Sequence, residues 1–294
     1  MKENVTGYEA LTLREYFGLV WPFMGRILAF SLGAGIVAVL VTFAFPVLYQ
    51  ASAVIKPDIN EQGKMSGAIG ALASFGINVD VGGPSKVEDL EVLFKSKDLT
   101  IRVFEKYKLW PLVFPREFDP KTGLINPGWS ERLLGRKGEP RPPGNWDAIR
   151  AAKERLGVVT DRRTGTLTLS YDAESPEDTA RIVEYYLEEA KSRLQEEALA
   201  RANRNKNFLL DQIDKTADPL TRDRLYALFG QEVEKEMLAK NREQFGFVRI
   251  DAPQVPDRKS KPRRVLAAFL AFLTAFFFAC LFLLVRRHGG GPDA

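Results

Sequence analysis

The chain has 294 residues, 45% of them hydrophobic, with 42 Lys+Arg against 38 Asp+Glu. This average conceals a separation, because residues 27–48 and 265–285 contain no charged side chain at all. All of the charge therefore lies in the rest of the chain, whose composition is typical of a water-exposed domain. The pattern excludes both a purely cytosolic globular protein and a transporter with many spans.

The two uncharged stretches are long enough to cross a bilayer. At ~1.5 Å per residue, their 22 and 21 residues reach the thickness of a hydrocarbon core, about 30 Å. A cleaved signal peptide is the alternative for the first stretch, but its apolar run exceeds the usual ~7–15 residues. Trp21 and Tyr49 suit the aromatic belts at the membrane interfaces. Charged residues lie at the ends of the uncharged stretches: Arg26 before the first, and Arg286 and Arg287 after the second. We expect two transmembrane helices.

Two spans place both termini on one side of the membrane and residues 49–264 on the other. The positive-inside rule does not decide the orientation, because Lys and Arg flank the spans on both sides. The rule holds best for loops under ~60 residues, and long domains are translocated largely regardless of charge. Segments 1–26 and 286–294 are expected to be too short for an independent domain, so we expect the function in 49–264 and the spans.

The first part of the large segment mixes strand and helix patterns. Residues 49–55 alternate until Pro57, as expected of a strand, and Gly-rich residues 63–83 predict a mobile loop. We predict a helical region at 85–109, with a break at Ser96–Asp98, and then a proline-rich excursion at 110–145. A helix at 146–156 and a β-hairpin of residues 157–160 and 166–171 follow.

A long helical hairpin follows. Ser175 with Pro176 is typical of a helix start, and no Pro or Gly interrupts the chain before Lys215. Asp218 and Pro219 start a second helix reaching Gln244, and a returning strand follows at 245–250. We therefore predict an α+β fold: an α/β base (49–174 and 245–257), a helical projection (175–244) and two flanking transmembrane helices.

Several motifs, taken in order, resemble the Wzz-type chain-length determinants, or polysaccharide co-polymerases. Residues 49–57 resemble the opening strand of that family, residues 175–180 its approach to the long helix, and residues 250–257 with 262–264 its closing motif. The chain departs from the family pattern in its Pro/Trp-rich segment 110–145 and in helices that are shorter than the family's longest. The first departure leaves the subfamily open, and the second predicts a shallower oligomer.

The resemblance implies an inner-membrane protein of Gram-negative type with cytoplasmic termini and a periplasmic main domain. It further implies a ring-shaped homo-oligomer that sets the length of a surface polysaccharide such as lipopolysaccharide O-antigen. The implied partners are a membrane polymerase or export machinery, membrane lipid and the polysaccharide itself.

Enzymatic chemistry finds little support in the residues. The single histidine, His288, follows the second span, which excludes a His-based triad or a multi-His metal site. Gly63-Lys64 lacks the remainder of a phosphate-binding loop. The acidic pairs Glu188-Glu189 and Glu196-Glu197 are better explained as a solvated helix surface than as a catalytic dyad. We expect no enzyme activity, catalytic residue, cofactor, metal or nucleic-acid partner.

Three sets of residues are candidates for non-catalytic roles. Prolines at the junction of domain and membrane stiffen the chain there: Pro253, Pro256 and Pro262. Alanines every four residues offer a face for close helix packing, or merely reflect a lipid-facing helix: Ala267, Ala271, Ala275 and Ala279. Four charged residues of the long helix are candidates for contact with a glycan or a neighbouring subunit, or else form a solvated face: Arg201, Arg204, Lys206 and Asp211.

The expected function is a non-catalytic oligomeric scaffold that regulates polysaccharide chain length. The alternative within the family is an adaptor for capsule or exopolysaccharide export. From another class, the alternative is a two-span extracytoplasmic sensor, which the nine residues after the second span leave without a signalling module. A periplasmic hydrolase ranks last, because no credible catalytic set is present.

Overall fold

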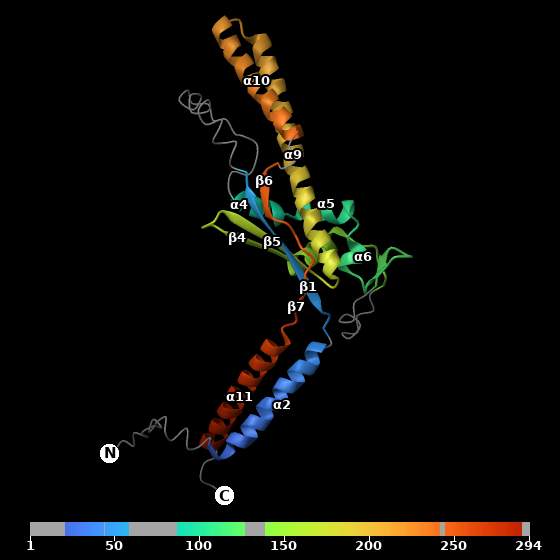
Figure 1. The fold of residues 1–294 in the computed structure, drawn as a ribbon, viewed down its shortest axis with the longest axis vertical. Coiled ribbons are helices and arrows are strands. Elements are labelled where there is room, and N and C mark those ends of the chain that lie inside the picture. The colour runs from blue at the N-terminus through green and yellow to red at the C-terminus, as the bar shows by residue number, and fades with distance from the viewer. Residues whose placement is uncertain (1–20, 44, 59–86, 127–138, 242–244, 290–294) are drawn as a thin grey trace, which may run out of the picture. The chain divides into compact units, whose positions relative to one another are not determined.

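The computed structural model describes residues 21–43, 45–58, 87–126, 139–241 and 245–289 (Figure 1). The chain divides into two compact units. Unit 1 comprises Met1–Val47 and Ser260–Ala294, and unit 2 comprises Leu48–Lys259. The predicted loop at 63–83 lies outside the described residues.

Unit 2 is built on an antiparallel sheet with the strand order β4-β5-β1-β6. The strand β1 thus pairs on both sides with strands that come much later in the sequence. The side chains of β1 alternate, so that Ala51, Ala53 and Ile55 are buried while Ser52 and Lys56 are exposed. The strands are β1 (Leu48–Pro57), β4 (Leu156–Asp161), β5 (Thr166–Ala173) and β6 (Phe247–Asp251). A short strand, β7 (Lys259–Lys261), lies at the boundary between the units.

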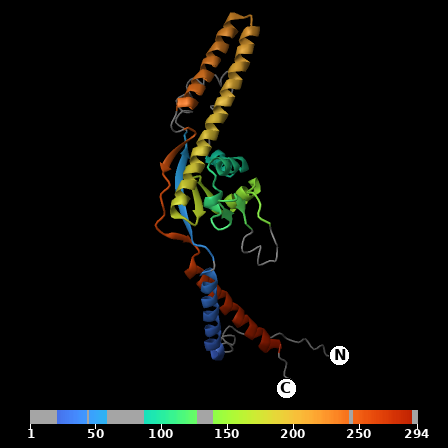
Figure 2. The ribbon, with the colours of Figure 1, turned by 90° about the vertical axis from the view of Figure 1, so that its right-hand side faces the viewer.

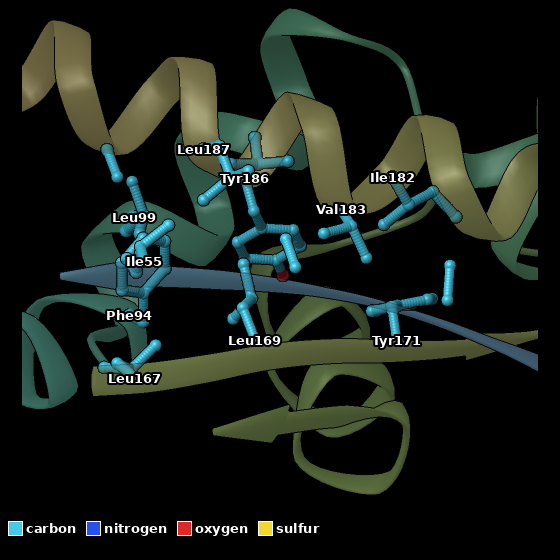
Figure 3. Close-up of a cluster of buried hydrophobic side chains, with 14 of the residues drawn as sticks. Ile55, Phe94, Leu99, Leu167, Leu169, Tyr171, Ile182, Val183, Tyr186 and Leu187 are labelled. Atoms are coloured by element: carbon cyan, nitrogen blue, oxygen red, sulfur yellow. The ribbon is translucent and has the colours of Figure 1, made fainter. Parts of the chain in front are cut away.

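Helices cover the apolar face of this sheet. The helix α9 (Pro176–Lys215) lies against β1 and β5, and Figure 3 shows Tyr186 pointing from α9 toward Leu169 of β5. The helices α4 (Val87–Phe94) and α5 (Lys97–Lys106) contribute Phe94 and Leu99 to the hydrophobic core between the sheet and the helices. The predicted break between them is confirmed, because the Ser96 side chain caps α5 by accepting a hydrogen bond from the Leu99 amide at 3.2 Å.

The proline-rich excursion contains only short elements among its described residues. They are α6 (Trp110–Val113) and the paired strands β2 (Phe118–Asp119) and β3 (Leu124–Ile125). The helix α8 (Asn145–Arg155) follows, and its buried Asp147 accepts hydrogen bonds from Arg141 and from the Gly144 amide. Prolines thus exclude a long helix here, as predicted.

The longest elements form a helical hairpin that extends beyond the sheet (Figure 2). The helix α9 (Pro176–Lys215) has 40 residues, and the Ser175 side chain accepts a hydrogen bond from the Asp178 amide at 3.4 Å. The helix α10 (Pro219–Asn241) packs against α9 and begins where Asp218 accepts from the Thr221 amide. The predicted α+β fold with a long helical hairpin is confirmed; its last residues, 242–244, lie outside the described residues.

Unit 1 contains two helices long and apolar enough to cross a membrane. They are α2 (Met24–Phe43), which follows the short 3₁₀ helix η1 (Trp21–Phe23), and α11 (Arg264–Gly289). The first helix was predicted to reach residue 48, but it ends at Phe43 and Leu48 already belongs to β1. Pro46 explains the difference, because proline lacks an amide donor and disfavours helix at the residue before it.

The two helices pack along one face of α2, two of whose three buried residues are small. Ile27, Ser31 and Gly35 recur every four residues and are its buried positions. A Cβ atom at Gly35 would lie 3.4 Å from the carbonyl oxygen of Ala268 and 3.8 Å from the Cβ of Phe272. The absence of a side chain at Gly35 therefore permits a close approach of the two backbones.

Replacing Gly35 by leucine should separate the helices. We expect Gly35→Leu to destabilise the protein by about 1–3 kcal/mol, because a larger side chain overpacks a tight contact. The midpoint of thermal unfolding of the full chain in detergent measures this. Gly33→Leu is the matched control, since nothing lies within 4 Å of a Cβ atom at Gly33. Equal midpoints for the two variants would contradict the packing assignment.

Candidate functional site

The interface between α9 and α10 carries a row of paired charges, which we call the polar seam. Glu232 of α10 is only 8% exposed and accepts hydrogen bonds from Lys235 at 2.6 Å and from the Asn205 amide group at 3.2 Å. One turn on, Glu236 pairs with Lys206 of α9 and with Lys240 at 2.6 Å. The seam thus joins the two helices where few apolar side chains are available.

The seam keeps the Glu236 carboxylate ionised. Hydrogen bonds from Lys206 and then Lys240 lower the pKa of Glu236 to about 2, because they stabilise the carboxylate form. The side chain of Lys206 is correspondingly only 20% exposed. The fixed charge of Glu236 at neutral pH is therefore part of the hairpin's structure.

The four charged residues predicted on the long helix do not form one site. Lys206 belongs to the polar seam, Asp211 pairs with Lys215 at 2.7 Å, and Arg201 pairs with Glu197 at 3.4 Å. Arg204 is exposed. Residues 201–211 extend along ~15 Å of helix, so a glycan or subunit contact through these side chains stays a prediction.

The acidic pairs of α9 connect it to α5. Glu189 is buried and accepts from Lys106 at 2.6 Å, while Glu188 accepts from the Tyr107 hydroxyl at 3.1 Å. Farther along, Glu196 accepts from Arg102 at 2.9 Å. These carboxylates connect α9 to α5 and to the residue that follows it, and they face cations or a hydroxyl group rather than one another.

A groove between α9 and β6 is a candidate binding site that the sequence did not indicate. It encloses about 460 Å³ and is lined by charged and aromatic side chains. Arg249 of β6 and Glu184 of α9 form an ion pair of 2.6 Å across it. The lining residues are Glu184, Leu187, Glu188, Lys191, Phe245, Phe247 and Arg249. Such a groove offers carboxylate acceptors and cationic donors to a polar molecule or to a neighbouring side chain.

The three junction prolines lie in the segment that follows β6. Pro253, Pro256 and Pro262 are all half-buried, and residues 252–256 have no regular secondary structure. The carbonyl oxygen of Pro262 accepts a hydrogen bond from the Arg264 amide at 3.0 Å, at the start of α11. Their role in stiffening the junction stays a prediction.

The four alanines of α11 lie beside the residues that approach α2. Ala267, Ala271, Ala275 and Ala279 are half-buried, and each is followed by another half-buried residue, of which Ala268 and Phe272 lie close to Gly35. In unit 1 this side of α11 is therefore near the chain's own first span. Its use against another subunit stays a prediction.

Within the residues that the structure describes, no group of three or more His, Cys, Asp or Glu side chains is arranged to hold a metal ion. Cys280, the one cysteine of the sequence, is half-buried in α11. The candidate sites are thus a polar groove and surfaces for packing, in a chain with two candidate membrane spans.

Comparison with known proteins shows a likeness to one family over about a third of the chain. The model of the Wzz family, described as chain length determinant protein, matches residues 9–107. This range begins before α2 and contains β1, α4 and α5. The resemblance to the Wzz-type chain-length determinants predicted from the sequence is therefore confirmed. No curated protein matches the chain.

Solved structures with some likeness to this chain include three proteins of related description. A full-length bacterial polysaccharide co-polymerase is 14% identical, with 96% of this chain and 100% of the other covered and a TM-score of 0.37. A fragment of the WzzB polysaccharide co-polymerase from Salmonella Typhimurium is 14% identical, covering 73% and 100%, with a TM-score of 0.33. A mutant of the lipopolysaccharide O-antigen chain-length regulator of Shigella flexneri is 13% identical, covering 72% and 100%, with a TM-score of 0.21. At these scores the likeness carries no further conclusion.

The polar seam predicts a specific acid sensitivity of the hairpin. Because the pKa of Glu236 in the folded chain lies below the ordinary value of 4.5, its ionised form stabilises the hairpin above pH 4.5. This contribution is lost as the pH falls from 4.5 to about 2. We expect Glu236→Gln to unfold more readily at pH 7 and to show a weaker loss of stability between pH 5 and pH 2.

Thermal unfolding followed by the circular dichroism of the helices, repeated across this pH range, measures the effect. Glu234→Gln is the matched control, because Glu234 lies exposed on the same helix. If Glu236→Gln and Glu234→Gln unfold with the same pH dependence, the polar seam does not stabilise the hairpin.

Proposed function

We propose that this chain is an inner-membrane chain-length determinant, a non-catalytic scaffold that regulates the length of a surface polysaccharide such as O-antigen. The observation that carries the proposal is the match of residues 9–107 to the Wzz family, in a chain whose two candidate spans flank an α+β unit. Unit 2 then lies in the periplasm, and the termini lie in the cytoplasm.

A scaffold role suits the physical character of unit 2. Its longest element, α9, spans about 60 Å and is tied to α5 and α10 by ion pairs. The hairpin also exposes large apolar side chains, including Phe208 at 63% and Leu220 at 63%. Apolar side chains on a solvated rod favour association, and we propose that other copies of the chain cover them in a ring.

The proposed partner is a membrane polymerase that elongates the polysaccharide while the ring holds the enzyme or the growing glycan. Export of a capsule or exopolysaccharide is the alternative within the same family. A two-span sensor is the alternative from another class, and it predicts a ligand-dependent response in place of an effect on polymer length.

Deleting the gene in its native host distinguishes these functions. We expect the surface polysaccharide, separated on a gel, to lose its modal length while polymer is still made, because regulation is lost and catalysis remains. Complementation with the intact gene is the control. Total loss of surface polymer would instead indicate export, and an unchanged ladder would contradict both functions.

The junction prolines are expected to transmit the geometry of the scaffold to the membrane. In the complemented strain, Pro256→Ala/Pro262→Ala should broaden the modal length, because alanine adds backbone freedom at each position. Pro140→Ala/Pro142→Ala is the matched control, since these two prolines are exposed in the excursion of unit 2. A sharp mode in both strains would contradict the proposed role of the junction.

A further inference from the structure

One wall of the groove between α9 and β6 is a single face of the long helix. The residues of α9 that line it follow the spacing i, i+3, i+4 and i+7, which places them on one side of a helix: Glu184, Leu187, Glu188 and Lys191. This wall therefore presents two carboxylates and an ammonium group around one apolar side chain.

A glycine brings the opposite wall close to the helix. Gly246 has a φ of 84°, and a Cβ atom there would lie 2.5 Å from Cδ1 of Leu194, so glycine suits both the backbone conformation and the close approach. Its two neighbours, Phe245 and Phe247, line the groove. Phe247 is buried and packs on Phe94, whereas Phe245 is only half-buried. The groove thus has one aromatic ring anchored in the core and another that solvent reaches.

Other side chains hold both carboxylates of the groove in place. Arg249 donates to Oε1 of Glu184 at 2.6 Å, and the Tyr107 hydroxyl donates to Oε2 of Glu188 at 3.1 Å. The ring of Tyr107 stacks on that of Tyr185, with centroids 4.1 Å apart. Among the described residues, the second oxygen of each carboxylate has no hydrogen-bond partner. Two acceptors are therefore held ready at fixed positions.

Lys191 supplies a donor to the same groove. The residue is half-buried, and its side chain forms no ion pair and no hydrogen bond within the part of the chain that the structure describes. A partly buried ammonium group is stabilised by any acceptor that replaces lost water. Lys191 and Arg249 also balance Glu184 and Glu188, so the lining side chains carry no net charge.

We propose that this groove binds an uncharged sugar unit of the polysaccharide, an inference that rests on the proposed function. Sugar hydroxyls donate and accept, as a site with free carboxylate oxygens and a free ammonium group requires. The accessible ring of Phe245 suits the apolar C–H face of a sugar. A phosphate would instead meet the like charges of Glu184 and Glu188. The volume of about 460 Å³ lies in the range of small-molecule sites, roughly 300–1,000 Å³.

Saturation-transfer NMR titration of the full-length protein measures the binding. The probe is the oligosaccharide released by mild acid from the surface polysaccharide of the native host, and the detergent has no sugar headgroup that could compete. We expect Lys191→Met to weaken binding of the probe roughly tenfold, because one hydrogen bond from a charged donor is lost. Lys191→Arg keeps a cationic donor and should bind the probe as the unchanged sequence does.

Lys153→Met is the matched control. Lys153 is an exposed lysine of α8 that does not line the groove, so this variant should bind the probe normally. Because the Lys191 side chain has no partner among the described residues, Lys191→Met should also keep the thermal midpoint of the unchanged protein. A loss of binding without a loss of stability then reports on the groove itself.

Three results would overturn the proposal. They are equal binding of the probe by Lys191→Met and Lys153→Met, no binding by the unchanged protein, and a smaller oligomer for Lys191→Met in light scattering. The last result would assign the groove to a neighbouring copy of the chain.

The gene-deletion gel separates this proposal from the proposed function. If deletion removes the modal length while the probe fails to bind, the sugar site is wrong and the length-regulating function stands. If deletion leaves the ladder unchanged, the function is wrong even where the probe binds.

Discussion

The first half of α9 lies on the apolar face of the sheet, and the other elements of unit 2 depend on that contact. Ile182, Tyr186 and Leu187 are fully or almost fully buried, and burial of each such side chain is worth roughly 1.5–3 kcal/mol. They face Leu169 and its neighbours on the two central strands (Figure 3). These two strands, β1 and β5, are far apart in sequence, so the helix covers a surface that exists only after long-range pairing. The sheet and the helix therefore stabilise each other, and neither would bury its apolar face alone.

The second half of the same helix follows a different physical rule. Beyond the sheet, its buried side chains are few and widely spaced, namely Ala202, Leu209 and Ile213. A two-helix hairpin cannot enclose a large apolar core, so the polar seam adds specific attraction between helices at modest desolvation cost. Paired charges also fix the register of α10 along α9, because Lys206 and Asn205 each have a particular acceptor on the facing helix. A rod that keeps one register presents one fixed outer surface, as the proposed scaffold requires.

The sequence could predict the features that local chemistry determines. Alternation placed β1, the Ser175 and Asp218 caps placed the hairpin helices, and Ser96 marked the break between α4 and α5. Pro46 also carried the signal for the early end of the first span, although the uncharged composition of the following residues concealed it. Partners distant in sequence could not be predicted. The groove needs Arg249 beside Glu184, 65 positions apart, and the inward role of Lys206 depends on Glu236 of another helix. Polarity alone does not distinguish a solvated charge from one that pairs across an interface.

The distribution of charge around the spans follows from the same distinction. In unit 2, Arg102 of α5 pairs with Glu196 of α9, and Lys206 of α9 pairs with Glu236 of α10, so these pairs connect different helices. Before α11 the basic residues outnumber the acidic ones, since Asp257, which pairs with Arg258 at 3.6 Å, is the last acidic residue of the sequence before Asp293. Arg264 instead stacks on the ring of Phe43 at the end of α2, so that an aromatic face takes the place of a carboxylate for this cation.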